Sequence, residues 1–501
     1  MAELNFITEQ IKSQIEDYKK NYIVRLAGRI VSSNDGVIMI EGLNDVKNGE
    51  LLYISGDSYA LALNLEEKIV GAILLSSVHN VSAGDIVYTT GKIVSVPAGD
   101  ALLGRVINPL GTPLDGKGDI VTDIYRNVEA SAPAIMDRAK VSSPLYTGIM
   151  AIDSMVPIGK GQRELIIGDR QTGKTSLALD AIINQKGKDV LCVYVAIGQK
   201  SSTITKIISD LIKHEALEYT VIVAATAGQP APLQYLAPYT GTALAEEFMY
   251  NGRDVLIIYD DLTKHAIAYR TISLLLKRPS GREAYPGDIF YIHSRLLERS
   301  AKLCDALGGG SLTALPIVET LAGDISAYIP TNVISITDGQ IYLESELFNE
   351  GIRPAINVGL SVSRVGGAAQ CDAMRKVSGK VRLDLAHYRE MALFSRFGAE
   401  LDASTKDILN RGELLTESLK QLQYSPKKMC DMVVELIVMK NNLLKDIKPN
   451  GVKEFIDGLI KYIYKKHKEV IDKIIITKDI DETDENTIIS IVNEYRESKI
   501  E

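Results

Sequence analysis

Residues 168–175, GDRQTGKT, constrain what this chain can fold into more than any other segment. They match the phosphate-loop pattern G-x-x-x-x-G-K-[ST] at every fixed position. The run 164–167 before them is typical of a short buried strand, and 176–183 after them is typical of a helix. A strand, a glycine-rich loop and a helix in this order form a cradle for phosphate groups. The segment therefore predicts a nucleotide-binding domain.

Each fixed residue type in this loop has a physical role. Gly168 and Gly173 let the backbone curl so that successive N–H groups face phosphate oxygens. Lys174 supplies a positive charge for the outer phosphates, and the Thr175 hydroxyl is a ligand for Mg²⁺. We expect the whole loop to line the site: Gly168, Asp169, Arg170, Gln171, Thr172, Gly173, Lys174 and Thr175.

The bulk composition is that of an ordinary globular protein of about three domains, with 46% hydrophobic and 24% charged residues in 501. A net charge of −8 disfavours a general nucleic-acid-binding role, because it repels a phosphate backbone. The four cysteines are widely separated, which predicts reduced thiols. No run of about 18 apolar residues occurs, so we expect membrane contact only through partners.

Two patterns precede the phosphate loop. In residues 1–22, Ile7, Ile11, Ile15 and Tyr18 form a narrow apolar stripe, which predicts a docking helix for another subunit or a helix packed on its own domain. In residues 23–94, short β segments separated by turn signals predict a small closed barrel. The expected strands are 23–31, 36–40, 50–54, 60–65, 69–74 and 86–90.

Residues 95–370 alternate apolar runs with helical segments such as 201–214, which predicts a mostly parallel sheet with helices on both faces. The expected strands after the loop are 190–197, 220–226, 255–259, 312–317 and 333–336. In residues 371–501 the β signal fades, and the pattern predicts a helical bundle. Its expected helices are 377–397, 405–422, 426–444 and 452–474, with one more in the charged tail. The fold class is thus multidomain α/β.

Two strand ends bear on the chemistry of the site. The apolar run 255–259 ends in Asp260 and Asp261, and we expect Asp260, with Asp261 as its rival, to hold Mg²⁺. In ring-forming ATPases a carboxylate that activates water follows the strand next to the phosphate-loop strand. Here the segment 198–203 contains no acid, and Gln199 cannot act as a base. The sequence predicts nucleotide and Mg²⁺ binding with impaired or absent turnover.

A further candidate lies in residues 360–369, LSVSRVGGAA. A single arginine, Arg364, stands among small side chains that a neighbouring molecule can approach closely. An arginine that is supplied in trans to a developing phosphoryl charge needs such a setting. The alternative is an ordinary solvated surface arginine.

With these segments, the chain resembles the alpha-subunit family of F-type ATP synthases over nearly its whole length. The motifs that carry the resemblance are GDRQTGKT at 168–175, VYVAIGQK at 193–200, LIIYDDL at 256–262, RPSGREAYPGDIFYIHSRLLERSAKL at 278–303, AYIPTNVISITDGQI at 327–341, GIRPAINVGLSVSRVG at 351–366 and LKQLQYSP at 419–426. Two departures are Leu321, where the family commonly has Gln, and Gly367, where it commonly has Ser. The N-terminus also lacks the family's acidic-proline opening.

The resemblance implies an N-terminal barrel, a central RecA-like domain and a C-terminal helical domain. It implies a ring of three alpha and three beta subunits around a central-stalk gamma subunit, with a peripheral-stalk delta subunit bound through the N-terminal helix. The complex would lie on the cytoplasmic face of a bacterial membrane and couple ATP synthesis or hydrolysis to ion transport.

The resemblance also assigns residues. Beta carries the catalytic Glu where this chain has Gln199, so the alpha site would bind Mg-ATP, or ADP, without turnover. Arg364 would enter the beta site as an arginine finger, with Ser361 opening the loop that positions it. Gln421 and Gln423 would lie near the adenine of the bound nucleotide.

The alternative function is a stand-alone catalytic hexameric ATPase, such as a secretion or helicase motor. Gln199 disfavours it, because a self-sufficient motor needs an acid at that position, and the net charge of −8 suits a nucleic-acid motor poorly. A plain nucleotide-binding module is a third alternative, which the SVSRVG segment disfavours.

Overall fold

The computed structural model describes residues 26–54, 58–75, 81–395 and 403–500. The chain divides into two compact units. The first unit consists of the chain up to Val94 together with two short later segments, 230–232 and 271–278. The second unit contains the remaining residues. The predicted docking helix in residues 1–22 lies outside the described residues. In the part of the chain that is described, no helix is both long and apolar enough to cross a bilayer.

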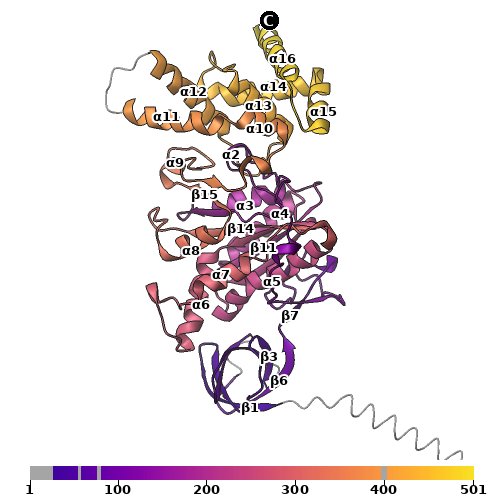
Figure 1. Ribbon diagram of the computed structural model, residues 1–501, viewed down its shortest axis with the longest axis vertical. Helices are drawn as coiled ribbons and strands as arrows, with labels where there is room; N and C mark the ends of the chain where they lie inside the picture. Colours follow the sequence, from indigo (N-terminus) through magenta and orange to yellow (C-terminus); the bar gives the residue numbers. More distant parts are fainter. Residues whose placement is uncertain (1–25, 55–57, 76–80, 396–402, 501) are drawn as a thin grey trace, which may run out of the picture. The chain divides into compact units, whose positions relative to one another are not determined.

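The first unit contains a closed barrel of antiparallel strands (Figure 1), which confirms the predicted small β-barrel. Its described strands are β1 (Ala27–Asn34), β2 (Val37–Glu41), β3 (Glu50–Ile54), β4 (Ser58–Leu65), β5 (Ile69–Leu74) and β6 (Ile86–Ile93). They pair in the order β1-β2-β5-β4-β3-β6, and β1 pairs with β6 to close the ring. Ile38 and Ile40, two residues apart on β2, share a face and belong to a core formed by the barrel alone.

The second unit is built on a sheet of eight described strands. They are β8 (Val106–Ile107), β10 (Leu165–Gly168), β11 (Val190–Gln199), β12 (Thr220–Thr226), β13 (Asp254–Asp260), β14 (Ser311–Glu319), β15 (Gly339–Leu343) and β16 (Val362–Ser363). Their order is β16-β15-β10-β14-β13-β11-β12-β8, and every pair is parallel except β15 with β16. The predicted mostly parallel sheet is confirmed. A small separate ribbon pairs β7 (Ser95–Pro97) with β9 (Tyr125–Asn127).

Helices cover both faces of this sheet, as predicted (Figure 1). They include α2 (Met150–Met155), α3 (Lys174–Ile183), α4 (Ser201–Lys213), α5 (Ala231–Tyr250), α6 (Leu262–Leu275), α7 (Ile289–Leu297), α8 (Tyr328–Ile336) and α9 (Ser345–Asn349). Leu177 on α3 and Ile204 on α4 share a core cluster with Tyr194 of β11. On the opposite face, α5 approaches β11 so closely that a Cβ at Gly241 would lie 2.3 Å from the Val195 side chain.

One predicted strand is wrong. Residues 333–336 belong to helix α8, and the strand that extends the sheet there is β15. The short run Val-Ile-Ser-Ile suggested a strand because it is rich in β-branched residues. The buried residues Ile329, Val333 and Ile336, however, lie at helical spacing, and this longer period decides the structure.

The C-terminal region is helical, as predicted. Its helices are α10 (Asp372–Ser378), α11 (Val381–Ser395), α12 (Ala403–Leu419), α13 (Met429–Lys440), α14 (Val452–Lys466), α15 (Lys468–Thr477) and α16 (Glu482–Ile500). Two of the predicted long helices are interrupted. Gly379 and Lys380 separate α10 from α11, and His467, with φ −132° and ψ 40°, separates α14 from α15.

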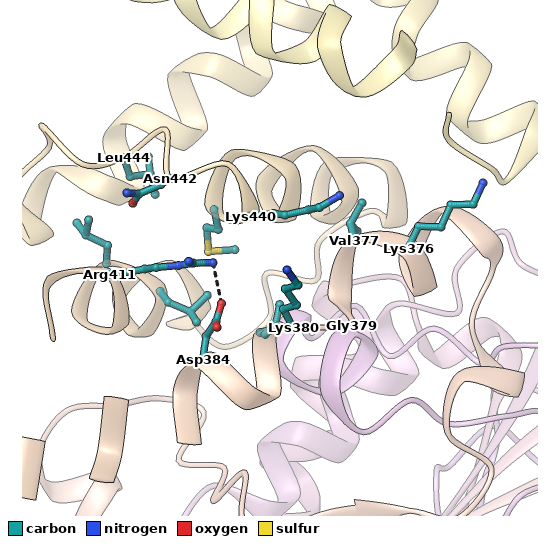
Figure 2. Close-up of a pocket in the computed structure, with 13 residues that line it drawn as sticks. Lys376, Val377, Gly379, Lys380, Asp384, Arg411, Lys440, Asn442 and Leu444 are labelled. Carbon is teal, nitrogen blue, oxygen red and sulfur yellow. Dashed lines mark hydrogen bonds and ion pairs between the residues drawn. The ribbon is translucent and has the colours of Figure 1, made fainter. Parts of the chain in front are cut away.

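A pocket of about 90 Å³ lies among α10, α11, α12 and α13 (Figure 2). The Arg411 guanidinium on α12 donates to the Asp384 carboxylate on α11 at 2.8 Å, and the two side chains point toward each other across the pocket (Figure 2). Beneath them, Val381 and Leu414 continue the apolar packing between the same two helices.

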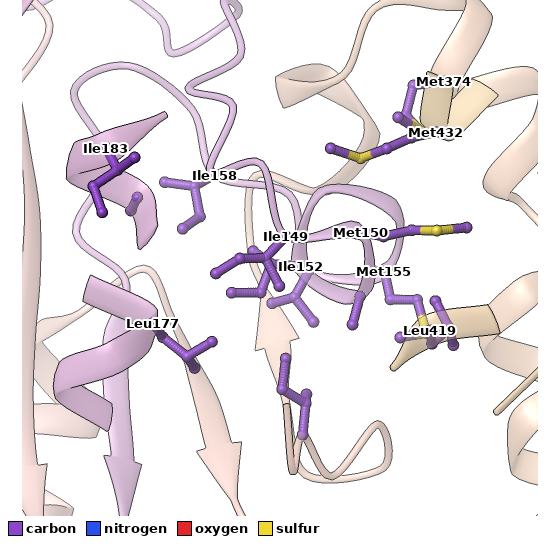
Figure 3. Packing of buried hydrophobic residues seen from close by; sticks show 14 of the residues in the cluster. Ile149, Met150, Ile152, Met155, Ile158, Leu177, Ile183, Met374, Leu419 and Met432 are labelled. Carbon is purple, nitrogen blue, oxygen red and sulfur yellow. The ribbon is translucent and has the colours of Figure 1, made fainter. Parts of the chain in front are cut away.

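The sheet and the C-terminal helices share one hydrophobic core. All six residues of the short helix α2 are buried. Figure 3 shows Ile149 and Ile152 near Leu177 of α3, while Met150 and Met155 lie near Met432 and Leu419. Since α2 packs on both sides, the C-terminal helices are held against the nucleotide-binding part of the unit by buried apolar contact.

Two buried histidines connect α6, the helix that follows Asp260 and Asp261, to α5 and α7. His265 on α6 contacts the carbonyl oxygen of Tyr235 on α5 at 3.1 Å and the Nε2 atom of His293 on α7 at 3.2 Å. A carbonyl can only accept, so Nε2 of His265 carries the proton and its Nδ1 accepts from His293. The Nδ1 atom of His293 is then a buried acceptor that finds no partner among the described residues. Burial lowers the pKa of His293 to about 4 and that of His265 well below its usual value.

This pair predicts acid destabilisation. The folded pKa of His293 is depressed, so its contribution to stability is complete above the unfolded pKa of about 6.5 and is lost as the pH falls toward about 4. Between about pH 7.5 and about pH 5 the expected loss from this residue is about 2 kcal/mol. We expect His293→Gln, which keeps a donor for His265, to lose less stability than wild type over this interval in denaturant unfolding. Equal losses of stability in the two proteins would show that His293 is not the cause of the acid destabilisation.

Candidate nucleotide-binding site

The phosphate loop lies where the sequence places it, between β10 and α3. Gly173 precedes the helix at φ 99° and Gln171 has φ 62°, so the loop uses the left-handed region at two positions. A Cβ at Gly168 would lie 2.4 Å from the Leu343 carbonyl oxygen, so this position requires glycine for close approach of β15. The loop therefore has the curled backbone that directs N–H groups toward an anion.

Lys174 is positioned by the loop itself. Its side chain is 6% exposed, and its Nζ donates to the carbonyl oxygen of Gly168 at 2.8 Å and to that of Asp169. Burial lowers the pKa of Lys174, while the nearby carboxylates, Glu319 first among them, oppose this shift. The Lys174 ammonium is thus partly desolvated. A partly desolvated cation forms a strong charge-assisted hydrogen bond with a phosphate that binds beside it.

The two predicted magnesium ligands lie in contact. The Thr175 hydroxyl donates to Oδ2 of Asp260 at 2.7 Å. Asp260 is 3% exposed and also accepts from the Tyr194 hydroxyl at 2.6 Å. A hydroxyl and a carboxylate at the end of a phosphate-binding loop are the oxygen donors that Mg²⁺ prefers, so the residues fit the ion. Among the described residues, no group of three His, Cys, Asp or Glu side chains could hold a metal ion.

Asp261 lies in a different environment from Asp260. Its carboxylate accepts from the backbone N–H of Lys264 at 2.8 Å and pairs with the Lys264 ammonium, so it caps the start of α6. Burial raises its pKa to about 6. This geometry favours Asp260 over Asp261 as the group that faces Thr175.

Gln199 ends β11 beside the same carboxylate. The expectation that this strand lies next to the phosphate-loop strand is wrong, because β14 and β13 lie between β10 and β11 in the sheet. Its Nε2 donates to Oδ1 of Asp260 at 3.0 Å. A neutral amide at this point donates a hydrogen bond to a buried anion, and it has no pKa that would let it take a proton from water.

One carboxylate at the site was missed by the sequence analysis. Glu319 ends β14, directly opposite Gly168, and accepts from the Arg170 guanidinium at 3.0 Å. The rule that singled out Asp260, an apolar strand ending in an acid, could have found it. Arg170 is largely exposed, so the loop presents its guanidinium outward with this carboxylate as its partner.

Asp169 holds the neighbouring segment to the loop. Its carboxylate accepts from the Thr320 hydroxyl at 2.6 Å, from the Gly323 N–H at 2.9 Å and from the Ser345 hydroxyl at 3.1 Å. These bonds lower its pKa despite partial burial. Leu321, one of the two departures from the family pattern, lies between these contacts and is 78% exposed, so it takes no part in them.

A cavity of about 490 Å³ adjoins the end of the phosphate loop. Thr172, Gly173 and Ser176 line one part, and Phe348, Arg353, Pro354, Gln421, Leu422 and Gln423 line another. The structure thus brings both predicted base-contacting glutamines to the loop. The Gln423 amide donates to the Ser176 hydroxyl at 2.8 Å, and the Gln421 amide donates to the carbonyl oxygens of Gly148 and Ser425. Mixed apolar and polar walls of this size suit a nucleoside base.

Arg364 and Ser361 do not join this cavity. They flank β16 at the edge of the sheet, two strands away from β10. Arg364 is exposed, and within the described part of the chain no hydrogen bond or ion pair holds its guanidinium. The Ser361 hydroxyl is buried and accepts from the backbone N–H of Tyr342 at 2.9 Å. The backbone of this segment is therefore anchored. Its arginine is exposed, and burial raises the pKa of Glu164 while the charge of Arg364 partly opposes that rise, so the guanidinium lies near this buried carboxyl.

The barrel, the phosphate-loop sheet with its acid-bearing strand end, and the helical region define a three-part nucleotide-binding protein of the RecA-like class. The chain matches the beta-barrel domain of the ATP synthase alpha/beta family over residues 23–91, the nucleotide-binding domain of that family over 148–363 and its C-terminal domain over 370–495. It belongs to the ATP synthase alpha/beta family.

Its relatives make the resemblance more specific. It is 56% identical over 490 residues to the ATP synthase subunit alpha of Clostridium botulinum strain Hall, which covers 98% of this chain and 97% of that protein. It is 55% identical over 493 residues to the ATP synthase subunit alpha of Caldanaerobacter subterraneus subsp. tengcongensis, with the same coverage. It is 58% identical over 464 residues to that of C. botulinum strain Alaska E43, which covers 93% of this chain and 92% of that protein. The resemblance to alpha subunits is confirmed.

The loop geometry predicts the effect of removing the Lys174 ammonium. Lys174→Ala deletes a charge-assisted phosphate contact, which typically contributes about 1.5–3 kcal/mol, so Mg-ATP should bind roughly 10- to 150-fold more weakly. Calorimetric titration of the full chain measures this difference. Lys186→Ala, which removes an exposed lysine paired with Glu215, is the matched control and should bind as wild type does. Equal affinities of wild type and Lys174→Ala for Mg-ATP would exclude Lys174 as a phosphate-binding residue.

Proposed function

We propose that this chain is the noncatalytic, regulatory alpha subunit of an F-type rotary ATP synthase. In this role it binds Mg-ATP or Mg-ADP in its own site and supplies Arg364 to the catalytic site of an adjacent beta subunit. One observation carries the proposal. The position for an activating acid is held by Gln199, whose amide is bonded to Asp260, while an exposed arginine lies at the far edge of the same sheet.

The chain's own site has the parts that binding requires. The loop backbone and Lys174 would hold the phosphates, and Thr175 and Asp260 would hold Mg²⁺, which when bound neutralises phosphate charge. Gln421 and Gln423 would lie beside the base, together with Arg353, whose carbonyl oxygen accepts from the Gln421 N–H at 2.8 Å. The proposal assigns Arg170 and Gln171 to the loop wall and Asp169 to its support.

Turnover is disfavoured by the chemistry at the end of β11. Hydrolysis needs a group that takes or orients the proton of the attacking water, and such a base contributes about 10²–10⁴-fold. Gln199 cannot accept that proton. Glu319 is the nearest alternative on an adjacent strand end, and its carboxylate is engaged by Arg170.

The Arg364 segment is built to present one cation. Ser361 binds the backbone of β15, the Ser363 hydroxyl donates to the Pro157 carbonyl oxygen at 2.7 Å, and the Arg364 N–H donates to the Asp338 carbonyl oxygen at 2.8 Å. With its backbone so anchored, the guanidinium can enter a neighbour's site with little loss of conformational freedom.

The remaining partners follow from membership of the complex. We propose an alternating ring of three alpha and three beta subunits, a gamma subunit at its centre and a delta subunit bound by residues 1–22. The complex would be peripheral to a bacterial cell membrane on its cytoplasmic face and would couple ATP synthesis or hydrolysis to ion translocation. The proposed domain limits are 1–22, 23–94, 95–370 and 371–501.

The missing base predicts that the purified chain is catalytically inert. A steady-state phosphate-release assay should find no turnover above background, because Gln199 offers no proton acceptor. Turnover of about 1–10 per second, typical of a working enzyme, would instead support a stand-alone motor. In that event Glu319→Gln should abolish the activity, which would identify Glu319 as the base.

The anchored arginine predicts a loss that appears only in the assembled complex. Arg364→Lys keeps the charge but lacks the planar fork that spans two phosphate oxygens, so turnover of the reconstituted alpha–beta complex should fall about 10³–10⁵-fold. Nucleotide binding by the chain itself should be unchanged, because Arg364 is not part of its own cavity.

The matched control is Arg375→Lys, which changes an exposed arginine paired with Asp372 on α10. Assembly, binding and turnover are scored separately for both variants. Normal assembly with near-normal turnover of Arg364→Lys would exclude the finger role. Failed assembly would show that Arg364 is a structural interface residue.

A further inference from the structure

Tyr424 joins the segment 421–425, between α12 and α13, to the sheet side of the unit. Its backbone N–H donates to Oδ1 of Asp180 on α3 at 2.6 Å. Its hydroxyl donates to Oδ2 of Asp210 on α4 at 2.8 Å, and its ring lies 5.1 Å from the ring of His214. Two helices therefore hold one residue of the segment, through its backbone and through its side chain.

The conformation of Tyr424 needs this support. Its φ of 57° is in the left-handed region, which a bulky side chain rarely adopts and which persists only where surrounding contacts impose it. The turn at Tyr424 determines where Gln423 and Leu422, its two predecessors, enter the cavity beside the phosphate loop. The Asp180 carboxylate accepts the hydrogen bond from the Tyr424 N–H at this turn, so it helps to determine where Gln423 and Leu422 lie.

Helix α3 connects the two halves of the cavity. Lys174 and Thr175 begin it, Ser176 accepts a hydrogen bond from Gln423, and Asp180 lies farther along the same helix. Asp180 is 6% exposed, and burial raises the pKa of its carboxyl to about 6, while the Tyr424 N–H and His214 oppose this shift. Helix α3 thus contains both the residues that would contact the phosphates and the carboxylate that holds residues 421–425 beside the base.

We propose that Asp180 is a positioning and specificity-determining residue of the nucleotide site, which fixes residues 421–425 so that the cavity recognises the base of a nucleoside triphosphate. This inference rests on the proposed nucleotide binding of the chain. Asp180 also lines the cavity, and its carboxylate accepts from the Tyr424 N–H, so we expect it to act on the base-facing segment and not on the phosphates. Its loss should therefore weaken the part of the binding energy that comes from the base and leave the phosphate part intact.

The test compares two ligands that share their phosphates. Mg-ATP carries a base, and Mg-tripolyphosphate does not. Both are titrated calorimetrically into the full chain as wild type, Asp180→Ala, Asp180→Asn and Tyr424→Phe. Glu218→Gln, at an exposed acid outside the cavity, is the control. Thermal unfolding of each protein shows whether the fold is kept.

We expect Asp180→Ala to bind Mg-ATP roughly 10-fold more weakly or worse, because a buried N–H loses a charged acceptor, with tripolyphosphate affinity within about 3-fold of wild type. Asp180→Asn keeps an acceptor oxygen and should recover most of the loss. Tyr424→Phe removes the Asp210 bond and should reproduce the same selective effect in smaller degree. If Asp180→Ala does not fold, Tyr424→Phe decides.

Three results would overturn the inference. Unchanged Mg-ATP affinity in the variants would show that the contact is dispensable for recognition. An equal loss for both ligands would show that Asp180 merely supports the fold of the phosphate loop. A wild-type chain that binds tripolyphosphate and ATP equally would also exclude base recognition, whereas a wild-type chain that binds neither would overturn the proposed function itself.

Discussion

The carboxylate of Asp260 is the point on which the site depends. It is almost completely buried, and a buried carboxylate is tolerated only where several donors compensate for its lost hydration. The donors come from separate elements: Thr175 from the start of α3, and Tyr194 and Gln199 from β11. The hydrogen bonds to this one carboxylate thus hold the phosphate loop, β11 and β13 in fixed positions relative to one another.

This arrangement explains why an amide at position 199 does more than remove a base. A carboxylate there would put a second negative charge about 3 Å from Asp260, which raises the cost of ionising both groups. Gln199 instead donates a hydrogen bond to Oδ1 of Asp260 at 3.0 Å. An amide at this position therefore cannot accept a proton from water, and it satisfies part of the hydrogen-bonding capacity of the buried Asp260 carboxyl.

The sequence predicted the parts of this structure that depend on local pattern. The barrel strands, the phosphate loop and the strand ending in Asp260 each have a period or motif that leaves few alternatives. Residues 333–336 were misassigned because four β-branched and small residues carry a strand propensity, while the helical period is visible only when Ile329 is included. The breaks at Gly379 and His467 were missed because helical composition continues through both. The contact of Tyr424 with Asp180 joins residues far apart in the chain, and no periodicity reports it.

The shared core makes the base-facing segment part of the same body as the phosphate loop. Helix α2 is buried against both α3 and the C-terminal helices, and the Lys427 N–H just after the segment donates to the carbonyl oxygen of Gly148 just before α2. The Lys427 ammonium pairs with Glu435, a buried acid of α13, so the exit of the segment is tied to the centre of the helical region. Because tightly packed interiors do not deform smoothly, the position of residues 421–425 depends on α2 and α13 as well as on the phosphate loop.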